Sequence, residues 1–169
     1  MNEIKTSALL SELMVMAKKI GSSSNPPFTA ERFVVALIEI IHNGTEAIAS
    51  AELKMAERLA TNALIDLTLA QNELIEYINQ GKSVSFLDDL YMKKKLQEAS
   101  AMATNAGADE VDTVALFMCI TKDPSEGLKL VMQATAEHTD TAQQVLEELE
   151  NRIAQLTEQP EPIQPEAND

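Results

Sequence analysis

The chain has 169 residues, of which 45% are apolar and only 4% aromatic, and it contains no tryptophan. A chain of this length fits one domain better than two, with a core that needs no disulfide or metal support. The net charge of −14 argues against nucleic acid or an anionic membrane as a partner and would attract basic peptide segments. The alternative is that the acidity only keeps the protein soluble.

Cysteine content and the N-terminal segment indicate where the protein resides. The single cysteine, Cys119, excludes an internal disulfide and a cysteine-rich metal site, and its apolar neighbours predict a buried side chain. Glu3, Lys5 and Glu12 interrupt the N-terminal segment in a way that does not fit a signal peptide. No apolar stretch approaches the roughly 20 residues of a membrane-spanning helix. We therefore expect a cytoplasmic protein.

The first half of the chain predicts two amphipathic helices and then a longer helical segment. The first helix runs from about residue 6 to 20 and ends at Gly21, and the SSSNPP segment after it forms a loop. Thr29 caps a second helix that Asn43-Gly44 ends, and Thr45 caps the next helical segment. The apolar stripes of these two helices contain Leu9, Leu10, Leu13, Met16, Ala17 and Ile20, and then Phe33, Val34, Leu37, Ile38 and Ile41. Residues 45–80 contain no Gly or Pro, and we expect two or three helices there before Gly81.

The second half predicts three further helices and an acidic tail. A helix over about 88–106 ends at Gly107, and Asp112 or Thr113 caps a short apolar helix that reaches about Thr121. Asp123-Pro124-Ser125 forms a turn that opens the next helix, and Asp140 with Gln143 forms a capping-box pattern that opens the last one. The expected apolar faces are Leu96, Ala99, Met102 and Ala103, and then Val145, Leu149, Ile153 and Leu156. Residues 158–169 are rich in Pro and acids and predict a linker or tail.

The two halves repeat one apolar pattern. At one constant offset, Leu10, Met16, Ala17 and Gly21 match Leu96, Met102, Ala103 and Gly107. At a slightly smaller offset, Phe28, Phe33, Val34, Val35, Ala36 and Leu37 match Val111, Leu116, Phe117, Met118, Cys119 and Ile120. Because the offset changes within the SSSNPP loop, where insertions cost little, the sequence predicts two related helical repeats, about 5–80 and 86–157, within one domain over 1–157. Two such copies would pack around a pseudo-twofold axis.

This arrangement resembles the Clp repeat domain, the N-terminal module of Clp/Hsp100 AAA+ unfoldases. In that family an Ala-rich helix and a Gly precede a motif similar to Val-x-Thr-Glu-His-Leu-Leu-Leu-Ala-Leu, and the counterparts here are FTAERFVVALI and VDTVALFMCI. The motif's Glu is Glu31 in the first copy and Val114 in the second, and its His is Arg32 and Ala115. The chain is therefore identified as a divergent relative of that family, with an all-α fold of roughly eight helices.

The resemblance implies a function that composition does not show. Such domains bind substrates or adaptor proteins beside an ATP-driven ring, and they carry no ATP chemistry, metal or cofactor themselves. The N-terminal Met and the Pro-rich acidic end fit an N-terminal module tethered to an AAA+ ring in cis. The alternative is a self-contained helical regulatory or oligomeric protein without an ATPase.

Candidate binding residues lie at the start of the second helix. In some family members the glutamates that match Glu31 bind phosphorylated arginine on substrates, so the resemblance implies a protein- or peptide-binding role for Glu31, Arg32 and Phe28. The alternatives are a carboxyl group that supports the helix N-terminus for Glu31 and hydrophobic packing for Phe28. Met14, Met16, Met102 and Met118 fall in apolar stripes and are expected in the core, whereas Met55, Met92 and Met132 stay undecided.

The sequence gives little support for a catalytic or nucleotide-binding site. Gly81-Lys82-Ser83 lacks the earlier Gly and the preceding strand of a phosphate-binding loop. His42 and His138 have no neighbours at metal-ligand spacing and are expected on the surface. The acid pairs at 88–89 and 147–148 are expected to lie on solvated helix faces. We therefore predict a protein-binding module with no catalytic residues.

Overall fold

The protein is all-α, as the sequence predicts. A computed structural model describes residues 4–21, 27–43, 50–82 and 86–158, and these residues form seven α-helices, in line with the roughly eight expected. The helices are α1 (Ala8–Ala17), α2 (Ala30–Asn43), α3 (Ser50–Leu64), α4 (Leu67–Asn79), α5 (Phe86–Asn105), α6 (Thr113–Lys122) and α7 (Glu126–Glu158). The chain divides into two compact units, Met1–Thr135 and Ala136–Asp169, so the division falls inside α7 rather than at the boundary expected after residue 157.

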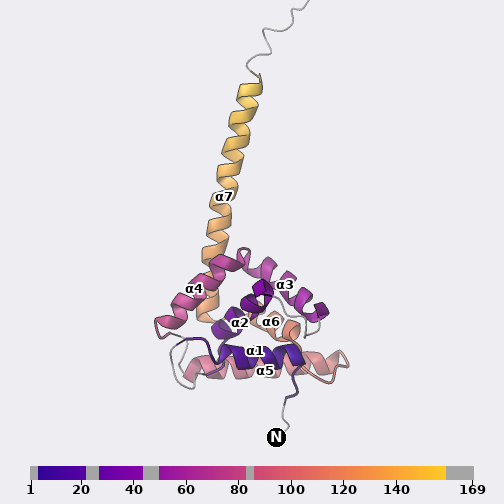
Figure 1. The fold of residues 1–169 in the computed structure, drawn as a ribbon. Helices are drawn as coiled ribbons and strands as arrows, with labels where there is room; N and C mark the ends of the chain where they lie inside the picture. The colour runs from indigo at the N-terminus through magenta and orange to yellow at the C-terminus, as the bar shows by residue number, and fades with distance from the viewer. Residues whose placement is uncertain (1–3, 22–26, 44–49, 83–85, 159–169) are drawn as a thin grey trace, which may run out of the picture. The chain divides into compact units, whose positions relative to one another are not determined.

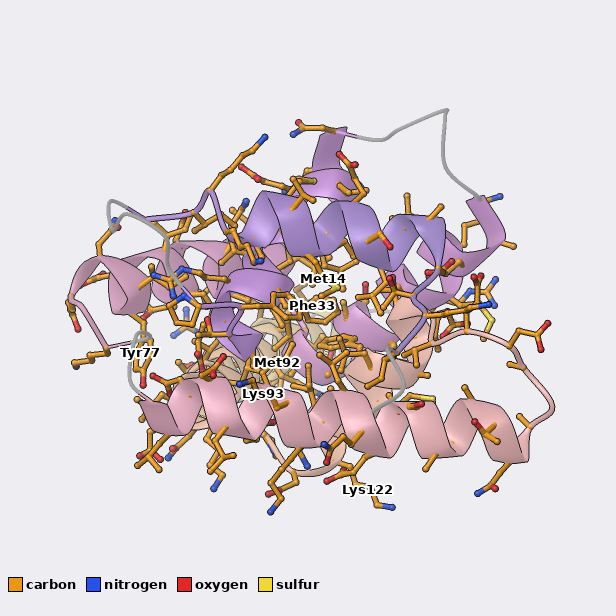
Figure 2. The ribbon with its side chains drawn as sticks, turned by 90° about the horizontal axis from the view of Figure 1, so that it is seen from below. Met14, Phe33, Tyr77, Met92, Lys93 and Lys122 are labelled. Atoms are coloured by element: carbon orange, nitrogen blue, oxygen red, sulfur yellow. The ribbon has the colours of Figure 1, made fainter. Side chains whose placement is uncertain are left out.

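Helices α2 and α6 form the centre of the first unit. Helix α2 packs against α1 and α4, and α6 packs against α5 and α3, so the two central helices lie between α1 and α5 on one side and α3 and α4 on the other (Figure 1). Every side chain from Ala30 to Ile38 is buried, which makes α2 the central helix rather than the one-sided amphipathic helix expected. The Phe33 ring meets the edges of Phe28 and Phe117 at centroid distances of 6.0 and 6.1 Å. Figure 2 shows Phe33, Met14 and Met92 in the interior of this unit.

Short-range signals set most helix ends. The hydroxyl groups of Ser7 and Thr29 accept hydrogen bonds from the backbone N–H of residues 10 and 32, and the Asp112 carboxyl group caps α6 in the same way at 2.8 Å. Gly21 and Gly107 both have positive φ, 91° and 79°, after α1 and α5. Such a conformation suits glycine, and α5 ends at Asn105, next to its predicted end, whereas α1 already ends at Ala17, before its predicted end near residue 20.

Helix α1 begins two residues later than predicted because the chain before it is extended. The backbone N–H of Ser7 donates to the Val111 carbonyl at 2.8 Å, and the N–H of Val111 donates to the Lys5 carbonyl at 2.8 Å. Thr6 therefore pairs with Val111 in a short parallel bridge, and the helix starts once Ser7 can cap it. This pairing joins the first segment of the chain to the entrance of α6.

The break between α3 and α4 occurs at Ile65 and Asp66. Ile65 has a φ of 61°, a conformation that is costly for a β-branched residue, and Asp66 then caps α4 by accepting a hydrogen bond from the N–H of Leu69 at 3.1 Å. The segment over 45–80 thus contains the two helices α3 and α4 within its described residues. The sequence signal for this helix break was Asp66, which stands between two helix-forming segments.

Helix α7 contradicts the prediction of a new helix at Asp140. The helix continues without interruption from Glu126 to Glu158. Neither Gly nor Pro occurs between Gly127 and Pro160, so nothing in the backbone stops it, and the capping-box pattern at 140–143 does not mark a helix start.

Most matched positions of the two halves have similar environments, but two pairs differ: Leu10 is fully buried and Leu96 only partly, and Val35 and Met118 differ more. Phe33 and Leu116 are both fully buried, as are Val34 and Phe117, and the Leu37–Ile120 and Ala17–Ala103 pairs are also buried. Val35 is buried, whereas its counterpart Met118 is 46% exposed, which contradicts the expectation that Met118 lies in the core. This similarity is what two related repeats would produce, and the duplication itself stays a prediction.

The remaining expectations on side-chain burial have mixed outcomes. Cys119 is buried, as predicted, and Met14, Met16 and Met102 pack partly buried against the core. Of the undecided methionines, Met92 is buried, Met132 is partly buried and Met55 is exposed. Pro26, Thr45, Ser83 and the 159–169 tail lie outside the described residues, as does the side chain of His138.

Candidate protein-binding site

The three residues predicted from the family resemblance lie inside the first unit. Glu31 and Arg32 are each 1% exposed and Phe28 is 9% exposed. Their position follows from α2 being the central helix, because its first turn is covered by neighbouring elements. A partner would not reach these side chains in this structure, so we do not place the recognition surface on them.

Glu31 and Arg32 instead hold neighbouring segments together. The Ser125 hydroxyl donates a hydrogen bond to the Glu31 Oε2, which ties the start of α7 to the first turn of α2. Arg32 Nε donates to the Ile20 carbonyl at 3.1 Å, at the end of α1. Burial lowers the pKa of the Arg32 guanidinium, and the charges of Glu31 and Asp88 oppose that effect. These contacts agree with the structural role considered for Glu31.

A second carboxyl group, Glu52 on α3, joins three helices and was not singled out from the sequence. Its Oε2 accepts a hydrogen bond from the Ser7 hydroxyl at 2.7 Å and another from the backbone N–H of Thr113 at 2.7 Å. It therefore lies at the N-terminal ends of both α1 and α6, where the helix dipoles favour negative charge. Only tertiary structure brings these residues together, so no local pattern could have identified the contact.

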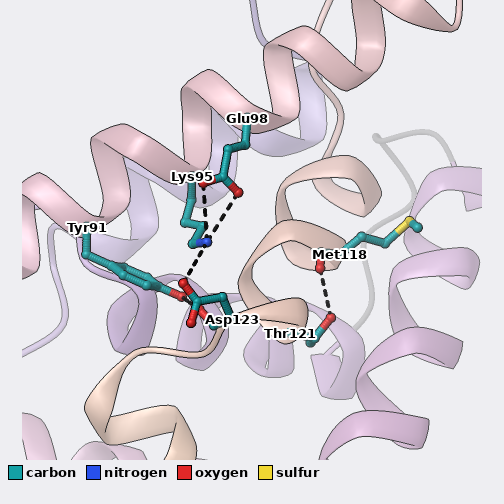
Figure 3. A network of polar contacts seen from close by, with 6 residues as sticks. All are labelled: Tyr91, Lys95, Glu98, Met118, Thr121 and Asp123. Atoms are coloured by element: carbon teal, nitrogen blue, oxygen red, sulfur yellow. Dashed lines mark hydrogen bonds and ion pairs between the residues drawn. The ribbon is translucent and has the colours of Figure 1, made fainter.

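A polar network fixes α5 to the turn before α7 (Figure 3). Lys95 is 4% exposed, and its Nζ lies 3.2 Å from Glu98 and 3.3 Å from Asp123. Burial alone would lower the pKa of Lys95, but the hydrogen bonds to Glu98 and Asp123 outweigh it and raise the pKa. The Tyr91 hydroxyl donates to the Asp123 carbonyl at 2.6 Å, and the Tyr91 ring lies 5.4 Å from the Lys95 Nζ. The network thus pairs the buried Lys95 ammonium group with two carboxyl groups whose side chains are 50% and 72% exposed.

An accessible groove lies between α4 and the first turns of α7. It has a volume of about 150 Å³ and is lined by Glu73, Glu76, Tyr77, Gln80, Lys82, Leu130 and Val131. Leu130 is 53% exposed, so the groove combines acidic side chains with an aromatic ring and an accessible aliphatic side chain. Figure 2 shows Tyr77 toward the outside of the unit, away from Phe33 and Met92.

The electrostatics of this groove are negative. Burial raises the pKa of the Tyr77 hydroxyl, and the charges of Glu31, Asp88 and Glu126 raise it further. The Lys82 Nζ lies 5.7 Å from the Tyr77 ring centroid, so the ring already has a cation over its face. A Lys or Arg side chain of a partner could bind this ring face only in place of Lys82.

A larger hollow of about 630 Å³ lies beside the N-terminal segment, but its chemistry fits a partner less well. Its lining has the same mixture of one lysine and two acids as the smaller groove, Lys5 with Asp109 and Glu110, but it contains no large hydrophobic side chain that is exposed. The smaller groove is therefore the better candidate for protein binding.

Other chemistry gains no support from the described residues. Gly81, with a φ of 77°, follows helix α4, so the segment before Gly81-Lys82 is helical, as predicted, and not the strand of a phosphate-binding loop. No three His, Cys, Asp or Glu side chains in the described ranges gather as metal ligands. Within those ranges, none of the helices is both long and apolar enough to cross a bilayer.

No family model, curated protein or solved structure matches the chain.

Proposed function

We propose that the chain is a non-catalytic protein-recognition module that binds substrates or adaptor proteins for a Clp-type ATP-dependent unfoldase. The observation that carries the recognition role is the acidic groove between α4 and α7, which combines Glu73 and Glu76 with the Tyr77 ring and the accessible Leu130. The link to an unfoldase is supported by the repeated helix–Gly–helix pattern and by the matching burial of its two copies.

The groove would select a segment that carries both positive charge and an apolar side chain. A Lys or Arg side chain would replace Lys82 on Tyr77 near the two glutamates, and an aliphatic side chain would contact Leu130. Weak capture of this kind raises the local concentration of a client beside an unfoldase pore, which is how a tethered recognition module would work.

The binding test uses a synthetic peptide that alternates Arg with Leu and a matched peptide in which Glu replaces Arg. We expect the basic peptide to bind the full chain, with an affinity that falls as salt rises. The double variant Glu73→Lys/Glu76→Lys should weaken binding at least about tenfold, because reversing two nearby charges is worth on the order of 1–2 kcal/mol. Glu12→Lys, on an exposed position of α1, is the control and should leave the affinity unchanged. Equal binding of the two peptides would contradict the proposed groove.

The unfoldase link needs a separate measurement. Affinity capture with the full chain, at low and moderate salt, should recover an AAA+ unfoldase, its adaptor or its known substrates, and the Glu73→Lys/Glu76→Lys variant should lose them. If the groove binds basic peptides but no unfoldase component is recovered, the alternative of a self-contained helical regulatory protein is favoured. The exposed apolar residues of α7 are the observation that supports this second candidate.

A further inference from the structure

The second half of α7 exposes an apolar stripe that shares Leu149, Ile153 and Leu156 with the predicted face but has Leu146, which was not predicted, in place of Val145. Leu146, Leu149, Ile153 and Leu156 are 60%, 48%, 62% and 67% exposed, and Val145 beside them is 52% exposed. All lie in the second compact unit, Ala136–Asp169. Contiguous exposed aliphatic side chains of this size mark an interaction site more often than an ordinary surface.

The spacing of the stripe is that of a coiled coil. Leu146, Leu149, Ile153 and Leu156 follow one another at intervals of three, four and three residues, which are the a and d positions of successive heptads. Only sequences that repeat in this way keep their apolar side chains along one seam between two supercoiled helices. The described part of the second unit is a single helix, and an isolated helix of this length is marginal in water.

The residues beside the seam fit a second copy in parallel register. In that register Glu150 would face position 145 of the other helix, a valine, and Arg152 would face position 157, a threonine, so no like charges meet. Glu147, Glu148 and Asn151 fall at positions that point away from the seam. The Nη2 atom of Arg152 also lies 3.3 Å from the Oε1 atom of Glu148 on the same helix, so this ion pair offsets part of the local negative charge. An antiparallel pair would instead bring Glu150 of each copy to the same side of the seam.

We propose that two copies of this chain associate through the apolar stripe of α7 as a short parallel coiled coil. Ile153 at one of the two a positions, with leucines at the d positions, favours two strands, whereas Leu146 at the other a position adds no such preference. Eight half-exposed side chains provide on the order of 700 Å² of buried area, below the roughly 1,200 Å² of a stable interface. The dimer is therefore weak and reversible. This inference does not depend on the proposed recognition groove.

Charge gives the association a distinctive salt dependence. The segment from Ala136 to Glu158 has six acidic residues, Glu137, Asp140, Glu147, Glu148, Glu150 and Glu158, against the single basic residue Arg152. Two like-charged copies repel one another, and added salt screens that repulsion, so the dimer should become tighter as salt rises. A basic helix of another protein on the same stripe would behave in the opposite way.

The test measures the mass of the full chain by sedimentation from about 5 to 500 µM, at low salt and at about 0.5 M salt. We expect a monomer–dimer equilibrium that shifts toward the dimer at higher salt. Leu149→Glu/Ile153→Glu should raise the dissociation constant at least about tenfold. The control Gln144→Glu/Asn151→Glu adds the same two charges at outward positions and should preserve the dimer at high salt. Because all four positions are exposed or outward, circular dichroism should show that each variant retains its helices.

A crosslinking experiment tests the parallel register. In a Cys119→Ala background, Leu146→Cys should form a disulfide between copies under mild oxidation, whereas Asn151→Cys, on the outward side, should not. A chain that stays monomeric at every concentration and salt overturns the proposal. So does a monomer that binds only an added basic amphipathic helix, or a dimer that Leu149→Glu/Ile153→Glu leaves intact. A dimer without the Leu146→Cys crosslink overturns the parallel register.

Discussion

Replacing Gly127 by alanine should reveal how tightly Glu31 is held at the start of α7. A Cβ atom at position 127 would lie 2.6 Å from the Glu31 Cγ and 2.7 Å from its Oε2. Glu31 is 1% exposed, so its carboxyl group has little room to move away, and moving it would break the hydrogen bond from Ser125.

Two opposing effects set the size of the change. Loss of a buried hydrogen bond costs about 1–3 kcal/mol, while alanine in place of glycine in a helix contributes up to about 1 kcal/mol. In the wild-type protein we expect Gly127→Ala to lower the free energy of unfolding by about 1–2 kcal/mol. In a Glu31→Ala background the obstruction is absent, and the same substitution should raise the free energy of unfolding by about 0.5–1 kcal/mol.

The assay is urea unfolding followed by far-UV circular dichroism on the wild type, both single variants and the double variant. The two backgrounds should differ by about 1.5–3 kcal/mol in their response to Gly127→Ala. Gly81→Ala is the matched control: its positive φ strains any other residue, and no atom lies within 4 Å of the added Cβ, so it should destabilise both backgrounds equally. If Gly127→Ala stabilises the wild-type protein as much as the Glu31→Ala variant, the contact between Glu31 and α7 is wrong.

Three further perturbations test the other contacts. Burial, followed by the charge of Asp123, raises the pKa of Tyr91, so its stabilising contribution is present below pH ~10, where an unfolded tyrosine ionises, and is lost as pH rises above that value. Urea unfolding across this range should show that the free energy of unfolding declines less steeply with pH for Tyr91→Phe than for the wild type. Parallel declines would refute the assignment. Glu52→Ala should lower the free energy of unfolding by about 2–3 kcal/mol, because the backbone N–H of Thr113 loses its acceptor. Glu52→Gln keeps an acceptor oxygen and should lower it by about 1 kcal/mol. Equal effects of the two substitutions would show that these hydrogen bonds do not stabilise the fold. Asp66→Ala should cost about 1 kcal/mol through loss of the α4 cap, measured by thermal unfolding, whereas Asp66→Asn should cost less than half of that.

The local sequence predicted those features that depend on near neighbours. Gly21 and Gly107 adopt a positive φ because that conformation needs only the residue itself, and Asp112 caps α6 because its acceptor reaches a donor three residues away. The same kind of signal misled at Asp140, since a capping pattern has no effect where the chain on both sides already favours a helix. Local patterns therefore predicted the helices but could not decide whether two of them were joined.

The candidate site depended on tertiary structure and was largely missed. Glu31 was singled out from a motif, but no sequence pattern shows that α2 is covered on all sides and that its first turn is therefore inaccessible. One signal for the groove was present: Glu73, Glu76, Tyr77 and Gln80 recur at intervals of three and four residues, which places them along one face of α4. Only the packing of α4 near α7 shows that this face forms a groove with Leu130.

The apolar stripe of α7 illustrates a further limit. Leu149, Ile153 and Leu156 were identified from the sequence as one face of a helix and Leu146 was not, yet all four are exposed. Periodicity reports that a face is apolar and does not say whether the surface that covers it belongs to the same molecule.

The pairing of Thr6 with Val111 and the position of Glu52 between Ser7 and Thr113 affect the order of assembly. Both contacts join segments that lie far apart along the chain, and both involve the ends of helices from different halves. Neither half alone supplies both partners of these contacts at its helix ends, so separately expressed fragments should be poorly structured and should regain structure on mixing. The closure of such long loops before these contacts form should also make folding slower than in an up-and-down helical bundle of equal length.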